Sequence, residues 1–126
     1  MRLMRPLHHR AVHEFRDAAE NGDAARLASL LDPDVAVVVD RGDRENPAIR
    51  VVRGAYEAVA LLVHGMAVAA EPDVVIEERT VNAQAGLMLN RGDRTIAAMT
   101  VDFTGGLISM VWIRLRPEQL RRWVEV

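Results

Sequence analysis

One stretch of the sequence constrains the architecture more than any other: Arg94-Thr-Ile-Ala-Ala-Met-Thr-Val-Asp-Phe-Thr-Gly-Gly-Leu-Ile-Ser-Met-Val-Trp-Ile-Arg-Leu-Arg116. It consists of two runs rich in β-branched and aromatic residues on either side of Gly105-Gly106. A glycine pair between such runs favours a two-residue turn, because both central residues of that turn need a positive φ angle. The sequence therefore predicts one long β-hairpin in which Thr104 pairs with Leu107.

Both faces of this hairpin are apolar. Side chains alternate between the two faces of a strand, and in the expected register Met99 pairs with Trp112. An antiparallel sheet with one solvated face alternates apolar with polar residues, so we expect both faces to be covered. Helices can cover one face, and the other would meet an internal cavity or a second copy of the chain. One face would carry Ala97, Met99, Val101, Phe103, Ile108, Met110 and Trp112, and the other Ile96, Ala98, Thr100, Asp102, Ser109, Val111, Ile113 and Leu115.

The composition is that of a single domain. A chain of 126 residues buries enough surface to fold without disulfides or metals, and we treat residues 1–126 as one domain. The absence of cysteine excludes thiol catalysis and thiolate metal sites, and it fits a reducing compartment. Because the sequence has neither the apolar run of a signal peptide nor the roughly 18 apolar residues of a membrane span, we expect a cytoplasmic protein without a membrane partner.

The charges exclude further classes of function. All 16 basic residues are arginine, which rules out a Schiff-base lysine and a P-loop lysine. The net charge is −2, so the chain lacks the basic excess of a dedicated nucleic-acid binder and no direct nucleic-acid contact is predicted. We predict no cofactor and no metal site.

Three helices and further strands are expected around the hairpin. Apolar residues at helical spacing, closed by Asn21-Gly22, predict a first helix, and Asp23 is placed to cap a second, short one. A third helix should start at Gly54. The expected elements are helices over 6–21, from 24 to before 32–34, and from 54 to before 71, strands over 35–40, 49–53, 74–81 and 86–90, and one or two helical turns over 117–123.

This order of elements is that of the nuclear transport factor 2-like fold, a cone in which a curved sheet wraps around helices. The segments 15–23 and 27–35 resemble the opening of SnoaL-like domains, where a helix ends in Gly-Asp before a leucine-rich turn and Pro-Asp-Val. The resemblance implies an α+β fold with a curved antiparallel sheet wrapped around three N-terminal helices.

Within that superfamily the chain most resembles the C-terminal SnoaL-like domain of actinobacterial extracytoplasmic-function sigma factors. Four segments carry the resemblance: Asp40–Arg44, Val52–Gly54, Val81–Leu87 and Arg116–Leu120. The first is charged where those domains have a glycine-rich loop, and the last keeps only a proline, an acid and a leucine. The resemblance implies a regulatory module that packs on a sigma factor or another protein, or that senses a small molecule. The promoter-binding regions of those sigma factors are not in this sequence, so promoter binding is not implied.

Two carboxylates are candidates for a general base. Asp40 lies at the end of a predicted strand before a polar loop, where a carboxylate is often presented at a pocket mouth; a turn-forming role before Gly42 is the alternative. Asp102 lies inside the hairpin, opposite Ser109 in the expected register. A buried Asp102 would have a raised pKa, as a general base needs, whereas near the turn it would be solvated.

Two arginines and a histidine complete the catalytic candidates. Arg53 and Arg114 could hold an anion or pair with either aspartate, an arrangement used by epoxide hydrolases of this fold, although surface pairing is the commoner fate of arginine. His64 near the end of the third helix could act as an acid or base, or it could simply face the helix dipole.

A second group of residues is expected to bind a ligand. Met99, Met110 and Trp112 form a cluster of large, soft side chains at adjacent cross-strand positions, which suits an apolar cavity or an interface and also suits a structural core. The candidate ligand-binding residues are Tyr56, Met99, Met110, Trp112 and Arg114.

Two functions remain open from the sequence. The first is a small-molecule-binding or regulatory SnoaL-like module, dimeric through its sheet face or bound to a protein partner. The alternative is a small enzyme of the polyketide cyclase, ketosteroid isomerase or epoxide hydrolase type, with Asp102 or Asp40 as base and Arg53 or Arg114 as charge stabiliser. A third possibility is a purely structural dimer, in which side chains fill the interior of the cone and leave no ligand cavity.

Overall fold

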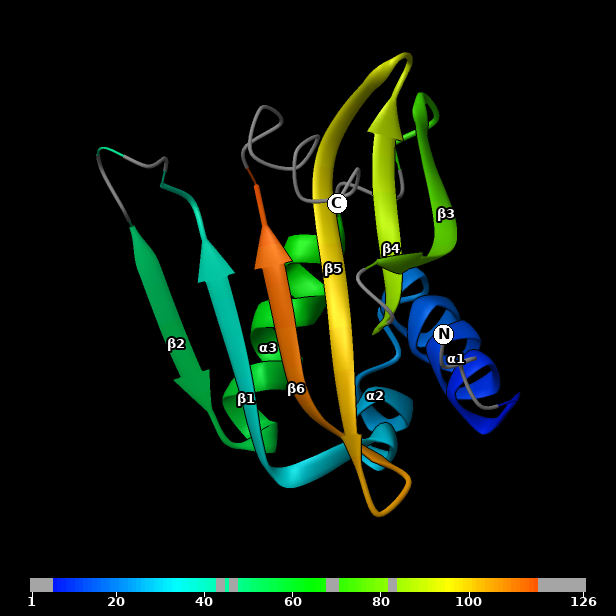
Figure 1. The fold of residues 1–126 in the computed structure, drawn as a ribbon. Helices are drawn as coiled ribbons and strands as arrows, with labels where there is room; N and C mark the ends of the chain where they lie inside the picture. The colour runs from blue at the N-terminus through cyan, green and yellow to red at the C-terminus, as the bar shows by residue number, and fades with distance from the viewer. Residues whose placement is uncertain (1–5, 43–44, 46–47, 68–70, 82–83, 116–126) are drawn as a thin grey trace.

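The computed structural model describes residues 6–42, 45, 48–67, 71–81 and 84–115. They form three helices and six strands, and the two arms of the predicted hairpin are the last two strands (Figure 1). The expected helical turns over 117–123 lie outside the described residues. The elements are α1 Pro6–Glu20, α2 Ala24–Leu30, β1 Leu31–Asp40, β2 Ile49–Arg53, α3 Ala55–Gly65, β3 Val74–Val81, β4 Gln84–Arg91, β5 Arg94–Thr104 and β6 Leu107–Arg114.

The strands form one open sheet in the order β2-β1-β6-β5-β4-β3. Neighbouring strands are antiparallel except for β1 and β6, which are parallel. The expectation of a wholly antiparallel sheet was therefore wrong at this one pair. The two strands are far apart in the chain, so no turn between them reveals their relative direction.

All three helices lie on one side of the sheet, which we call its inner face; the opposite side is the outer face (Figure 1). The inner face of every strand contributes to one apolar core with the helices. In β1, for example, Val35, Val37 and Val39 belong to the core, so alternation places Ala36, Val38 and Asp40 on the outer face. Among the described residues, none of the helices has the length and apolar character that a membrane span requires.

The turn of the β5–β6 hairpin forms as predicted, with Thr104 opposite Leu107 and positive φ angles of 59° and 84° at Gly105 and Gly106. Beyond the turn the register differs from the expected one. Asp102 pairs with Met110 and Phe103 with Ile108, so Ser109 is an extra residue in β6. This β-bulge was not predicted.

The bulge has a local cause and a large effect. The Thr104 hydroxyl donates to Ser109 Oγ at 3.0 Å, and Ser109 Oγ donates to the Asp102 carbonyl at 3.4 Å, so the extra residue is held by the turn. Because side chains alternate, one inserted residue exchanges the two faces of everything after it. Met99 therefore pairs with Ile113 and not with Trp112.

The other elements agree with the sequence apart from the positions of several ends. β1 begins at Leu31 and not at Val35, since the chain leaves α2 directly into extended backbone. Pro33 is accommodated there because the β1 register shifts between Leu31 and Ala36, where an irregular strand needs no donor. β4 is two residues longer at its start, and α3 ends at Gly65.

Candidate functional site

A cavity, called here the α3 cavity, lies between α3 and the inner face of the sheet. Its volume is about 260 Å³. The lining contains aliphatic side chains, two methionines and one glycine, and no titratable side chain. The lining residues are Val39, Leu61, Leu62, Gly65, Met66, Leu89, Ile96, Ala97, Met99, Ile113 and Leu115.

Small residues at the ends of two elements keep this space open. Gly65 closes α3 without a side chain, and Ala97 brings only a methyl group from β5. Larger side chains fill the base of the cavity, because Leu62 and Met66 point from α3 into the core and are nearly fully buried. Met99, predicted as a ligand-binding residue, lines the cavity from β5.

The predicted cluster of Met99, Met110 and Trp112 is split by the sheet. The bulge at Ser109 puts Ile113 on the inner face beside Met99, so Met110 and Trp112 project from the outer face. The expectation that the three side chains share one face was wrong for this reason. Their individual roles in binding stay predictions.

Asp40, Arg114 and Trp112 form a second group, on the outer face. Asp40 Oδ2 lies 3.6 Å from Arg114 Nη1, and its Oδ1 accepts the Gly42 N–H at 3.2 Å, as the turn-forming alternative predicts. The Arg114 guanidinium lies 5.6 Å from the centre of the Trp112 ring, within the range of a cation–π contact. The pairing of Asp40 with Arg114 was among the expected ones, but this pair lies across the sheet from the α3 cavity.

Asp102 is exposed on the outer face, where it pairs with Met110 and not with Ser109. Its carboxylate accepts a hydrogen bond from the Gln84 amide. This is the solvated alternative, since the Asp102 carboxylate is not buried.

The remaining candidates lie apart from both groups. Arg53 is exposed on β2. His64 and Tyr56 lie on the exposed side of α3, where they border a shallow groove against α2, and Tyr56 is 91% exposed. The structure therefore brings Asp40 and Arg114 together and places no predicted catalytic residue in the lining of the α3 cavity.

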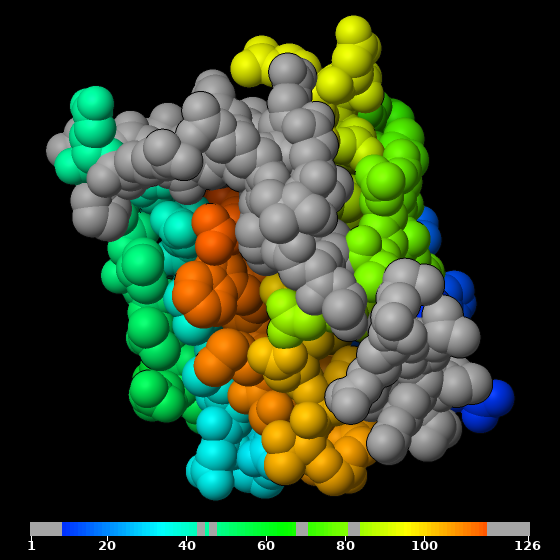
Figure 2. Space-filling model, in the orientation of Figure 1, coloured from blue at the N-terminus to red at the C-terminus, as the bar shows by residue number. Residues whose placement is uncertain are grey.

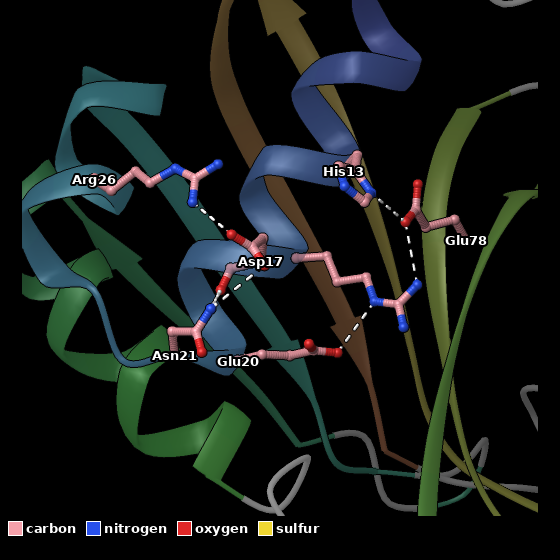
Figure 3. Close-up of polar contacts among 7 residues, drawn as sticks. His13, Asp17, Glu20, Asn21, Arg26 and Glu78 are labelled. Atoms are coloured by element: carbon pink, nitrogen blue, oxygen red, sulfur yellow. Dashed lines mark hydrogen bonds and ion pairs between the residues drawn. The ribbon is translucent and has the colours of Figure 1, made fainter.

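A polar network joins α1 to β3. Glu78 Oε2 accepts hydrogen bonds from His13 Nδ1 at 3.0 Å and from Arg16 Nη1 at 3.1 Å, while Arg16 also contacts Glu20 (Figure 3). Partial burial raises the pKa of the Glu78 carboxyl, but the two donors outweigh it and the pKa lies below its usual value. Within the described residues no group of three or more histidine, aspartate or glutamate side chains is placed to hold a metal ion.

Sequence reasoning missed most of the cavity lining. Leu61 and Gly65 gave no signal of a cavity. Ile113 and Leu115 were assigned to the face opposite Met99, because the bulge was not foreseen. A serine flanked by a glycine-pair turn is the one feature that could have suggested it.

Neither a family model nor a curated protein sequence matches this chain. Solved structures do. The extracytoplasmic function sigma factor SigJ of Mycobacterium tuberculosis matches with a TM-score of 0.68 and 21% identity, over 92% of this chain and 44% of the SigJ chain. This chain thus spans less than half the length of SigJ.

Two further structures match over nearly their whole length. An NTF2-like protein of unknown function from Cytophaga hutchinsonii has a TM-score of 0.57 and 12% identity, over 96% of this chain and 97% of that one. A Mycobacterium tuberculosis LEH-like epoxide hydrolase has a TM-score of 0.53 and 15% identity, over 94% and 90%. At these identities the matches establish a fold and not an activity. The chain has the α+β fold of these structures, among them the NTF2-like protein, as the resemblance to the nuclear transport factor 2-like fold predicts.

Proposed function

We propose that this protein is a binding module that takes up an apolar small molecule in the α3 cavity. The observation that carries the proposal is the lining: a space of about 260 Å³ surrounded by apolar residues between α3 and β5. Ligand pockets are mostly apolar, with a few polar groups that fix orientation. Here the described lining offers no such side chain, so shape and apolar surface would select the ligand.

The enzyme alternative has less support. A general base must lie within hydrogen-bond reach of the proton that it removes, directly or through one water. Asp40 projects from the outer face, and its neighbour Val39 lines the cavity from the other side of the strand. Asp102 is exposed on the outer face as well. A ligand in the cavity would therefore meet neither carboxylate without a change in the sheet.

The resemblance to sigma-factor domains suggests what binding would serve. SigJ shares the fold over most of this chain, but more than half of SigJ has no counterpart here. We therefore propose regulation through protein contact, with the occupied and empty module differing in their affinity for a partner, and we do not carry over the activity of a complete sigma factor.

The outer face is part of the same proposal. Trp112 and Met110 form a half-buried apolar patch on the outer face of β6, beside Ala36 and Val38 of β1, which are already nearly fully buried. A second copy packed on this patch would give the homodimer expected from the sequence. Sedimentation velocity of the wild type and of Trp112→Glu tests this: a dimer that the substitution dissociates supports it, and a wild-type monomer at tens of micromolar contradicts it.

Ligand uptake can be tested with Nile red, a neutral apolar dye. Ala97→Leu adds bulk to the cavity, and since overpacking costs about 1–3 kcal/mol we expect dye binding to weaken about tenfold. Ala60→Leu, on the exposed side of α3, is the matched control and should bind as the wild type does.

Ala97→Leu and Ala60→Leu also distinguish dye binding in the α3 cavity from dye binding in the groove between α2 and α3. Ala60 borders the shallow groove between α2 and α3, so loss of binding in Ala60→Leu alone would place the dye there and contradict the proposal. Native mass spectrometry of protein isolated from its own host would then identify any retained ligand. A cavity that excludes Nile red and apolar ligands alike would also refute the proposal.

A further inference from the structure

The strand β2 is an open edge of the sheet. Among the residues that the structure describes, it is the terminal strand of the sheet and pairs only with β1, while β3 forms the other end (Figure 1). In the space-filling view β2 forms the left margin of the outer face (Figure 2). An edge strand carries unpaired backbone groups that can bind another chain.

The hydrogen bonds at both ends of β2 show which backbone groups are unpaired. The Arg41 N–H donates to the Ala48 carbonyl at 2.9 Å, and the Gly54 N–H donates to the Val35 carbonyl at 2.8 Å. In an antiparallel pair, residues that bond to the partner alternate with residues that face away. Arg50 and Val52 therefore bond to β1 together with Ala48 and Gly54. The N–H and C=O groups that face away from β1 belong to Ile49, Val51 and Arg53.

The same three residues have exposed side chains on the outer face. Ile49 is 56% exposed and Val51 is 47% exposed, and Arg53 is exposed beside them. Exposed apolar residues at an open edge are unusual, because natural sheets normally protect edges with lysine, proline, bulges or a covering element. The strand β2 contains no lysine and no proline, and its register with β1 is regular.

The charge of β2 indicates which chain would suit this edge. Arg50 and Arg53 give the strand two positive charges, and it contains no acidic residue. A second copy paired antiparallel about Val51 would place Arg50 opposite Val52 and Arg53 opposite Ile49, so neither arginine would meet an opposite charge. A segment with acidic residues opposite the arginines and apolar residues opposite Ile49 and Val51 would complement both features.

We propose that the open edge of β2 binds an extended, acidic and apolar segment of a partner protein as an additional strand. Such strand addition takes affinity from main-chain hydrogen bonds and specificity from alternate side chains. The inference names a surface for the protein contact proposed above and rests on that contact, but it does not depend on the α3 cavity. Failure of peptide binding would leave Nile red binding unaffected, so the two proposals fail separately.

The register of β2 specifies a test peptide. An antiparallel peptide should place an acidic residue opposite each arginine and an apolar residue opposite Val52, Val51 and Ile49. Read from the residue opposite Arg53 to the residue opposite Ile49, this gives Glu-Val-Ile-Glu-Ile. We would flank this core with Gly-Ser, label it with fluorescein and titrate it by fluorescence anisotropy. The peptide Arg-Val-Ile-Arg-Ile is the charge-reversed control, and we expect it to bind at least about tenfold more weakly.

N-methylation of the peptide tests the strand geometry. The central isoleucine would donate its N–H to Val51, whereas the N–H of the valine before it would point away from the edge. Since a hydrogen bond contributes about 1 kcal/mol and the methyl group also obstructs pairing, N-methylation of the isoleucine should weaken binding about tenfold. N-methylation of the valine should change it by less than about threefold.

Protein variants test the same contact from the other side. Val51→Pro removes an N–H that β1 does not use, so the fold should persist while peptide binding is lost. Val51→Thr keeps this N–H and should retain binding. The double variant Arg50→Glu, Arg53→Glu should reverse the preference and bind the arginine peptide better than the glutamate peptide, which keeps the test valid if the proline variant unfolds.

Three results would overturn the proposal. The first is that the anisotropy of the labelled glutamate peptide does not change when folded protein is added up to millimolar concentration. The second is equal binding of the two N-methylated peptides, which would show contact without strand pairing. The third is a homodimer that Val51→Pro dissociates, because the edge would then accept a second copy and not an acidic partner.

Discussion

The two ends of the sheet differ in how their open edges are protected. At one end, β3 carries charged residues near Val75, its single strongly exposed apolar residue, and Glu78 is joined to α1 through His13 and Arg16 (Figure 3). At the other end, β2 exposes Ile49 and Val51 beside two arginines and has no such network among the described residues.

The difference shows that one sheet can keep one edge closed and leave the other available. Arg91 near β3 pairs with both Glu71 and Asp73, so ion pairs also hold the chain that leads into that strand. Charged groups at an edge oppose the approach of another chain, because pairing would remove them from water. The β2 edge carries Arg50 and Arg53 beside an apolar strip, a combination that an acidic and apolar partner strand would match.

The largest expected effect is at Gly86 in β4, the strand that joins β3 to the rest of the sheet. A Cβ at this position would lie 2.5 Å from the Met99 carbonyl oxygen, and backbone cannot move away as a side chain can. We expect Gly86→Ala to destabilise the protein by about 2–3 kcal/mol in urea denaturation.

Hydrogen exchange would show which edge this substitution loosens. Amides of β3 and β4 should exchange faster than in the wild type. Amides of β1 and β2 should still exchange only through global unfolding. Gly65→Ala is the matched control, since a Cβ there meets nothing within 4 Å and φ is not positive. Equal loss of protection at both ends would mean that the sheet unfolds as a single unit.

A smaller effect is expected from the Glu78 network. Its pKa lies below the usual value in the folded protein, so the carboxylate stabilises the fold at neutral pH, and this contribution is lost as the pH falls through the folded pKa. Because the groups are largely exposed and screened, Glu78→Gln should cost only about 0.5–1 kcal/mol at pH 7. The difference from wild type should be full above the usual glutamate pKa of about 4.3 and should fade as the pH falls below it and through the lower pKa of the folded state.

Glu77→Gln is the control for this prediction. Glu77 is a neighbour on the same strand, its contact with Arg79 is 3.9 Å long, and it does not contact α1. We expect no measurable change in the urea midpoint at either pH. Equal effects of the two substitutions would mean that the link between α1 and β3 contributes nothing of its own.

The smallest effect on stability is expected at the β2 edge. Val51→Lys should change the free energy of unfolding by less than about 0.5 kcal/mol, because the side chain is exposed and makes no core contact. It should nevertheless slow aggregation on heating, measured by light scattering, since lysine protects an edge. Val75→Lys on β3 should have little influence on aggregation, and equal protection by both would show that the edges do not differ.

Most of the fold could be predicted because local signals agree with it. The glycine pair at 105–106 specified a turn with positive φ angles, and Asp23 caps α2 through a hydrogen bond from the Arg26 N–H at 3.1 Å. The bounds of β2 and β3 were predicted to the residue. The parallel pairing of β1 with β6 could not be predicted, because only tertiary packing determines it.

The site was less predictable because it depends on register. The alternation of β5 was correct from Ala97 onward, but a register shift at Ile96 brings that residue into the cavity lining. The extra residue at Ser109 exchanged the faces of β6, so Met110 and Trp112 left the cavity and Ile113 entered it. No propensity distinguishes a strand with a bulge from one without. Asp40 and Arg114 were correctly paired, but alternation alone could not show that the helices cover the other face.

The bulge at Ser109 also implies that the chemistry of the cavity wall depends on backbone pairing and not on residue identity alone. If Ser109 entered a regular ladder opposite Asp102, the remainder of β6 would shift by one position and turn Met110, Trp112 and Arg114 toward α3, with no side chain replaced. Loss of the bulge geometry could thus convert an aliphatic pocket into one containing an aromatic ring and a cation. Homologous modules with the same residues in β6 could on this basis select different ligands.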